Sequence, residues 1–266
     1  MIDTEKKNLL GVMVNAIDRE SAADLIIQAA QQHRSYAVSA LAVHGVMEGV
    51  LRPAHLYRLN HLELTVADGQ PVRWALNLIH DAGLKERVYG PSLTVSVLVR
   101  AEQLGIPIFF YGSTPDVLAS LRVNIAARYP KLIIAGAEPS QFGRLSSGGA
   151  SELANRITQS GAQIVFIGLG CPRQEVWAYE FRKRLNMPLV AVGAAFPFMA
   201  GTLRQAPAWM QDHGLEWLFR LYNEPRRLWR RYLLLSPVYL LLMACQWMGV
   251  RFHTDGEAPQ REILYG

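Results

Sequence analysis

The sequence contains little cysteine and little charge. Only two cysteines, Cys171 and Cys245, occur among 266 residues. They are too few for a disulfide framework or a four-cysteine zinc site, and they favour a reducing compartment. Charged residues make up 18% of the chain and hydrophobic residues 50%. This composition excludes an intrinsically disordered protein and predicts a folded domain with a substantial core.

Several motifs that identify common functions are also missing. The chain has no HExxH and no DxD, and its seven histidines show no metal-ligand spacing, so we expect no metal site and no cofactor. A G-x-G-x-x-G fingerprint is absent after the first predicted strand, which argues against a dehydrogenase. The first 18 residues hold too short an apolar run for a signal peptide. We therefore expect the protein in the cytosol or on the cytosolic side of a membrane.

The basic charge is concentrated directly before a long uncharged run. Five arginines and one acid, Glu224, lie within 220–231, and no charged side chain occurs in 232–250. Such a run approaches the roughly 20 residues that cross a bilayer, although Pro237 predicts a kink or break. Arginines beside an apolar helix favour a peripheral position on an anionic leaflet. A buried helix or a homo-oligomer contact is the alternative, whereas nucleic-acid binding is not indicated.

Apolar runs alternate with helix-like stretches over the first 200 residues. Several runs show no polar alternation, which is typical of strands covered on both faces. We predict strands at 36–43, 62–67, 106–112, 132–137, 162–170 and 188–196. We predict helices at 21–33, 93–104, 115–129 and 151–160. Ser21 and Thr114 are expected to cap the first and third of these helices, and residues 139–149 are expected to form a loop.

Strands that alternate with helices predict an α/β fold. We expect a Rossmann-like, mostly parallel sheet with helices on both faces, spanning residues 1–200. A C-terminal helical, membrane-associating appendage would follow at 201–252, and the polar segment 253–266 would be a flexible tail. Because ligands of such sheets bind at the carboxyl ends of the strands, the residues after each strand form the candidate site.

Four strand ends or turns carry residues suited to ligand binding. Asp68 is either a catalytic carboxylate or a turn aspartate that satisfies local backbone N–H groups. Gly112 opens a turn onto a helix N-terminus, which suits a phosphate. Gln174 and Glu175 follow a glycine-rich turn that either approaches a ligand closely or only joins a strand to a helix. Arg87 either holds a diphosphate or is an ordinary surface arginine.

A series of motifs spread over residues 11–232 carries a family resemblance. They are ADGQPV (67–72), RVYGPSL (87–93), FFYGSTPDV (109–117), YPKLIIAGAEPSQF (129–142), GLGCPRQEVW (168–177), AGTLRQAPAWM (200–210) and GLEWLFRLYNEPRRLWRRY (214–232). In this order and spacing the sequence resembles the WecG/TagA/CpsF family of bacterial glycosyltransferases, glycosyltransferase family 26. No single block is decisive, but the blocks together are specific.

The resemblance implies an inverting, metal-independent transfer of a sugar from a UDP-sugar donor. The acceptor is a polyprenyl-diphosphate-linked saccharide at the cytoplasmic face of the inner membrane, in cell-surface polysaccharide biosynthesis. N-acetylmannosamine, its uronic acid and glucose are the donor sugars that the resemblance leaves open. Asp68 corresponds to the family's proposed general base, which takes the proton of the acceptor hydroxyl.

The leaving UDP carries negative charge that the resemblance assigns to protein groups. Without a metal, arginines and helix N-termini must stabilise this charge. The residues expected to bind the substrates in this way are Arg87, Gly112, Gln174, Glu175, Arg220, Arg227, Arg230 and Arg231.

The sequence departs from the family pattern in three places. Ala40 and Ala42 stand where the family usually has Thr-x-Asn, Pro197 replaces an aspartate, and Gln205 replaces an arginine. These positions are expected to line the pocket. They motivate a second hypothesis, in which the chain is a non-catalytic nucleotide-sugar-binding scaffold of a polysaccharide assembly complex.

Overall fold

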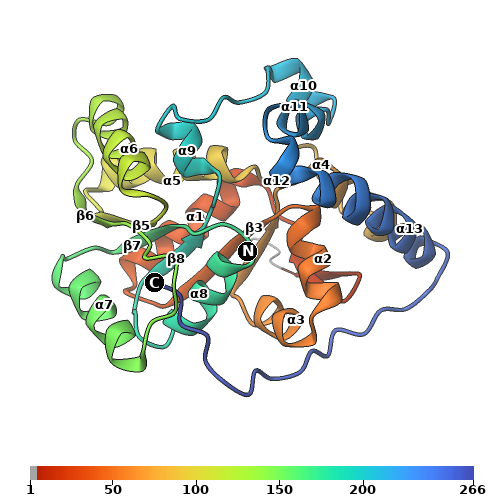
Figure 1. The fold of residues 1–266 in the computed structure, drawn as a ribbon, viewed down its shortest axis with the longest axis horizontal. Helices are drawn as coiled ribbons and strands as arrows, with labels where there is room; N and C mark the ends of the chain where they lie inside the picture. Colours follow the sequence, from red (N-terminus) through yellow and green to blue (C-terminus); the bar gives the residue numbers. More distant parts are fainter. Residues whose placement is uncertain (1–4) are drawn as a thin grey trace.

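The computed structural model describes residues 5–266, except for the side chains at positions 208 and 212. The described residues form one eight-stranded sheet with the order β1-β2-β4-β3-β8-β7-β5-β6 (Figure 1). β1 and β2 pair antiparallel, and every other neighbouring pair is parallel. The predicted α/β fold with a mostly parallel sheet is therefore confirmed. The strands are β1 Lys6–Leu9, β2 Val12–Asn15, β3 Tyr36–Leu41, β4 Leu64–Ala67, β5 Ile108–Gly112, β6 Ile134–Glu138, β7 Ile164–Gly168 and β8 Pro188–Ala191.

Helices cover both faces of this sheet, and a separate apolar core lies beneath each set. The helices on one face are α1 Arg19–Gln31, α5 Gly90–Leu104, α6 Pro115–Arg128 and α9 Ala195–Met199. Those on the other face are α2 Val43–Leu51, α3 Pro53–Asn60, α4 Gln70–His80, α7 Ser147–Gln159 and α8 Arg173–Phe181. This arrangement confirms the expected layers of helix, sheet and helix.

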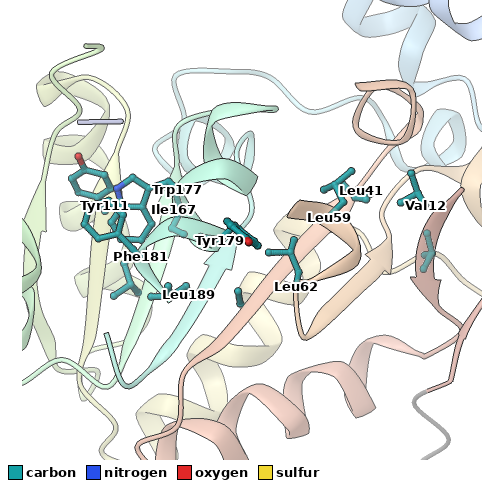
Figure 2. Packing of buried hydrophobic residues seen from close by; sticks show 14 of the residues in the cluster. Val12, Leu41, Leu59, Leu62, Tyr111, Ile167, Trp177, Tyr179, Phe181 and Leu189 are labelled. Atoms are coloured by element: carbon teal, nitrogen blue, oxygen red, sulfur yellow. The ribbon is translucent and has the colours of Figure 1, made fainter. Parts of the chain in front are cut away.

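Aromatic rings fill the core beneath α8 (Figure 2). The ring of Trp177 stacks on Phe181 with centroids 4.0 Å apart, and on Tyr111 with centroids 4.9 Å apart. Phe110, the neighbour of Tyr111 on β5, is buried in the core on the opposite face. Because successive side chains of a strand point to opposite faces, burial of both explains why β5 shows no polar alternation.

Several predicted element boundaries are wrong. The N-cap of α1 is Asp18, whose carboxylate accepts the Ser21 N–H at 2.8 Å, so the capping role expected of Ser21 belongs to Asp18. Thr114 is confirmed as the N-cap of α6. The loop expected at 139–149 is shorter, because α7 begins at Ser147. β1 and β2 were not predicted, because β1 (KKNL) is mostly polar and β2 (VMVN) has only three apolar residues in a row, which is too short a run to indicate a strand.

The C-terminal appendage is helical, as expected. α12, η1 and α13 form one continuous helix, Pro225–Trp247, that is long and apolar enough to cross a membrane by length and composition. Only 11% of its most apolar stretch is buried. Pro237 does not break it, because this residue lies in the first turn of α13, after a π-helical turn. The elements are α10 Ala208–Asp212, α11 Glu216–Asn223, α12 Pro225–Arg230, η1 Arg231–Leu235 and α13 Ser236–Trp247.

The segment 253–266 is packed against the sheet domain. It leaves the end of α13, runs back along the molecule and finishes near α7 (blue in Figure 1). The Leu145 N–H donates to the Leu264 carbonyl at 2.8 Å, and the Gly266 N–H donates to the Gly143 carbonyl at 3.1 Å. Leu264 is buried in the core that contains α8. These contacts contradict the loose tail expected from its polar composition, because three apolar residues at 263–265 give it an anchor.

Candidate active site

A pocket of about 440 Å³ lies between the carboxyl ends of β3 and β4 and the appendage. The sheet domain contributes residues 42–44 and 68–71, Trp74 and Arg87. The appendage contributes residues 213–217, Arg220, Arg231, Tyr232, Ser236, Pro237, Tyr239 and Leu240. Parallel sheets bind their ligands at this edge, and here the appendage closes the site from outside the sheet.

Asp68 lies at the floor of this pocket, directly after β4. Its backbone N–H donates to the Leu41 carbonyl of the neighbouring β3 at 3.0 Å, which fixes its position. Its carboxylate accepts the Gly90 N–H at 2.6 Å. Burial raises the pKa of Asp68 above its ordinary value, against the opposing influence of Arg87 and the Gly90 N–H. A carboxylate with a raised pKa that opens into a pocket is suited to proton transfer.

Arg87 joins the sheet domain to the appendage. Its Nη2 donates to Oε2 of Glu216 at 2.6 Å, and both side chains are largely buried. The Tyr89 hydroxyl donates to the other oxygen of Glu216 at 3.1 Å, and the Arg87 guanidinium lies 4.1 Å from the centre of the Tyr89 ring. This network fixes α11 over the turn that carries Asp68. Arg87 is therefore part of the pocket rather than an ordinary surface arginine.

Glu216 and Tyr89 were not predicted as site residues. Both lie inside quoted motifs, Tyr89 in RVYGPSL and Glu216 in GLEWLFRLYNEPRRLWRRY. The available signal was that Glu216 precedes Arg220 by one helical turn and so shares its face. What the sequence could not show is that this face meets Arg87, which lies more than a hundred positions earlier.

The arginines of the appendage divide into two groups. Arg220 and Arg231 line the pocket, and the buried Nε of Arg220 makes no hydrogen bond to any described residue. Arg227 is exposed and pairs with Glu224 at 2.6 Å. Arg230 is exposed and lies beside the ring of Trp229. Two of the four expected arginines are thus in the same pocket as Asp68, and the other two are outside its lining.

Gly112, Gln174 and Glu175 also lie outside the lining of this pocket. Gly112 ends β5 with φ of 105°, packed closely against Gly168, at the turn onto α6. Gln174 and Glu175 are buried in the first turn of α8. The Glu175 carboxylate accepts the Ser39 hydroxyl at 3.1 Å and the Gln174 side-chain N–H at 2.8 Å. Their expected role in substrate binding stays a prediction.

Within residues 5–266, His, Cys, Asp and Glu side chains form no group of three or more that could hold a metal ion. Burial raises the pKa of the Cys171 thiol, and the charge of Glu175 adds to this effect. A thiol in this environment is protonated and a poor nucleophile. Cys171 is therefore best described as a packing residue of the turn before α8.

Comparison with known proteins identifies the family. Residues 7–252 match the model of the glycosyl transferase WecG/TagA/CpsF family. The chain belongs to this family. Its members are glycosyltransferases of cell-surface polysaccharide biosynthesis that use a nucleotide-sugar donor and a lipid-linked acceptor. The match covers the sheet domain and the appendage, including Asp68, Arg87 and Glu216, and it ends where the packed segment 253–266 begins.

Proposed function

We propose that the protein is an inverting, metal-independent glycosyltransferase. It moves N-acetylmannosamine, its uronic acid or glucose from a UDP-sugar to a saccharide on polyprenyl diphosphate. The observation that carries this proposal is the carboxylate of Asp68, with its raised pKa, in a pocket that also holds the unpaired guanidinium N–H of Arg220. A base and a cationic group in one pocket are what attack on a diphosphate-activated sugar requires.

Asp68 would act on the acceptor hydroxyl. The carboxylate takes the hydroxyl proton while the oxygen attacks the anomeric carbon and the bond from that carbon to the UDP oxygen breaks. Attack from the face opposite the leaving group inverts the configuration at the anomeric carbon. Because burial raises its pKa, Asp68 is a stronger base than an exposed aspartate, which favours this proton transfer.

The arginines of the pocket would stabilise the departing diphosphate. The lining holds three arginines and two carboxylates, Asp68 and Glu216. Glu216 pairs with Arg87, whereas no carboxylate of the described residues pairs with Arg220 or Arg231. These two guanidinium groups are left to meet an anionic ligand, and such groups stabilise charge most strongly where water is excluded.

The appendage would bring this pocket to the lipid-linked acceptor. The helix Pro225–Trp247 is apolar and largely exposed. Two of its residues, Arg231 and Tyr232, also line the pocket. We place the protein peripherally at the cytoplasmic face of the inner membrane, where apolar side chains enter the interface and arginines meet anionic headgroups.

The test is UDP release by the purified full-length protein with a panel of UDP-sugars and a short-chain polyprenyl-diphosphate saccharide. We expect acceptor-dependent release that survives EDTA. Release should fall at least about a hundredfold in Asp68→Asn, the usual scale for loss of a general base. Arg122→Gln, which changes an exposed arginine of α6 outside the pocket, serves as the control. Full activity in Asp68→Asn would refute the base assignment, and loss of activity in EDTA would refute metal independence.

A non-catalytic scaffold is the second candidate. The observation in its favour is Ala42, which lines the pocket where the family usually has asparagine. This hypothesis predicts that the protein binds UDP-sugar, as measured by calorimetry, but releases no UDP with any acceptor. Acceptor-dependent turnover by the unmodified protein would exclude it.

A further inference from the structure

His44 shares the pocket with Asp68 and has no role in the transfer described above. It follows β3 and lies in the first turn of α2. β3 pairs in parallel with β4, the strand that leads to Asp68. Because these two strand ends are neighbours, the imidazole and the carboxylate face one cavity, and both belong to its lining.

The two ring nitrogens of His44 have different surroundings. Nδ1 is buried and has no hydrogen-bond partner among residues 5–266. It lies 3.8 Å from Oε1 of Glu48, which is longer than a hydrogen bond but close enough to favour a proton on Nδ1. That tautomer leaves the lone pair of Nε2 free. Nε2 is then the ring nitrogen available to a molecule in the pocket.

The charged groups around His44 keep its ring neutral. Burial lowers the pKa of His44 to about 4, and the nearby Arg231 of η1 and Arg52, which joins α2 to α3, add to this effect. Glu48 also faces the ring but pairs with Arg52 at 2.7 Å, and His55 of α3 lies near enough to interact with it. A neutral imidazole donates from one nitrogen and accepts at the other, so with the proton on Nδ1 the Nε2 atom accepts, which suits a hydroxyl rather than a phosphate.

The surroundings of His44 indicate which ligand group it meets. Ala42 and Val43, which precede it in the chain, form an apolar wall of the lining, and the lining also includes the aromatic residues Trp217 and Tyr232. Apolar and aromatic walls with a few polar groups are typical of small-molecule sites, and a sugar offers both C–H faces for stacking and hydroxyl groups that donate hydrogen bonds. With alanine at position 42, His44 is the polar group that this wall offers.

We propose that Nε2 of His44 accepts a hydrogen bond from one hydroxyl of the acceptor sugar bound beside Asp68, and so helps to select that sugar. The proposal rests on the proposed function, because Asp68 takes its proton from the acceptor. It assigns the acceptor because the sugar whose hydroxyl meets Asp68 lies at the neighbouring ends of β3 and β4, and His44 lines the same pocket just after β3.

The experiment compares full-length His44→Ala, His44→Gln and unmodified protein with the short-chain polyprenyl-diphosphate saccharide of the release assay and with analogues whose sugar lacks one hydroxyl each. We expect His44→Ala to raise the acceptor KM about tenfold, the scale of one hydrogen bond, with the donor KM unchanged. Glutamine, whose side-chain oxygen can replace Nε2 as acceptor, should restore most of this loss. His61→Ala, an exposed histidine outside the pocket, is the matched control.

The deoxy acceptors decide whether the contact is direct. For the unmodified protein, one deoxy acceptor should have a KM about tenfold higher than the complete acceptor. In His44→Ala the same two acceptors should have equal KM values, because the hydrogen bond is already lost. Equal penalties in both proteins, or a change confined to the donor KM, would overturn the assignment and leave the transferase intact. If the unmodified protein transfers no sugar, the proposed function fails. In that case, calorimetry measures the affinity of Asp68→Asn, with and without His44→Ala, for the acceptor and its deoxy analogues. A direct contact again predicts that one deoxy analogue loses affinity only when His44 is present.

Discussion

Asp68 and Glu216 are the two carboxylates of the pocket, and their surroundings give them different roles. Glu216 is held by Arg87 at 2.6 Å and by the Tyr89 hydroxyl at 3.1 Å. The Asp68 carboxylate receives one backbone N–H, and burial raises its pKa. Two neighbouring carboxylates in different environments can serve one site in different ways. Glu216 is therefore a positioning residue that holds Arg87.

We predict that Glu216→Gln moves the acidic limb of the pH profile of kcat/KM to lower pH. The base must be ionised, so the rate falls as pH falls through the Asp68 pKa. The negative charge of Glu216 raises this pKa, and its removal must lower it. We also expect kcat to drop about tenfold, because Arg87 loses a charged hydrogen bond. Glu224→Gln, which removes a carboxylate paired with Arg227 outside the pocket, should leave the limb in place. If the acidic limb does not move in Glu216→Gln, the charge of Glu216 does not influence the pKa of Asp68.

At the scale of elements, the helix Pro225–Trp247 has two unlike sides. Tyr239 is buried, and its hydroxyl donates to the Pro71 carbonyl of α4 at 3.1 Å, so one side anchors the helix to the sheet domain. The other side exposes large apolar residues. They are Leu233, Leu234, Val238, Leu240, Leu241 and Trp247. A helix with one packed side and one exposed apolar side is suited to lie in a membrane interface.

We predict that Leu241→Glu weakens binding to vesicles that contain anionic lipid. Leu241 is 65% exposed, so the change should not disturb the fold. Loss of one buried leucine costs about 1.5–3 kcal/mol, which corresponds to at least about tenfold weaker binding in a flotation assay. Val123→Glu on α6, at a residue that is 69% exposed, should bind as the unmodified protein does. Equal binding of both variants would place the helix away from the membrane.

At the level of the whole molecule, the segment 253–266 links the appendage to the loop after β6, the strand at one edge of the sheet. It passes a buried ion pair between Arg58 of α3 and Glu180 of α8, 3.0 Å apart. Arg58 also donates to the Arg261 carbonyl at 3.5 Å. At its end, the Ser140 hydroxyl donates to the Gly266 carbonyl at 2.5 Å. The segment therefore connects helices that are distant in sequence and belongs to the packed structure.

We predict that Arg58→Ala lowers the free energy of unfolding by about 3–5 kcal/mol, measured in urea. The substitution leaves the Glu180 carboxylate buried without its cation, and this imbalance dominates the cost. Arg184→Ala is the matched control, because Arg184 pairs with Glu262 of the same segment but near solvent. It should cost at most about 1 kcal/mol. If the two variants lose similar free energies of unfolding, burial of the ion pair between Arg58 and Glu180 does not explain the cost of Arg58→Ala.

Sequence patterns were enough to predict the layers of the fold and the position of Asp68 after a strand. Unbroken apolar runs require strands covered on both faces, and parallel strands place their following turns at one edge. Gly112, Gln174 and Glu175 also follow strands, yet they lie outside the lining of the pocket that holds Asp68. Strand order decides which turns are neighbours, and a local pattern does not contain that order.

The side chains around Asp68 and the path of the C-terminus could be learned only from the folded chain. The pairing of Glu216 with Arg87, the division of the arginines and the place of His44 in the pocket all arise from contacts between distant segments. Composition predicted a loose tail, whereas a few apolar residues and backbone hydrogen bonds hold it in place. Local sequence determines how a segment folds, but burial and charge pairing depend on which segments meet.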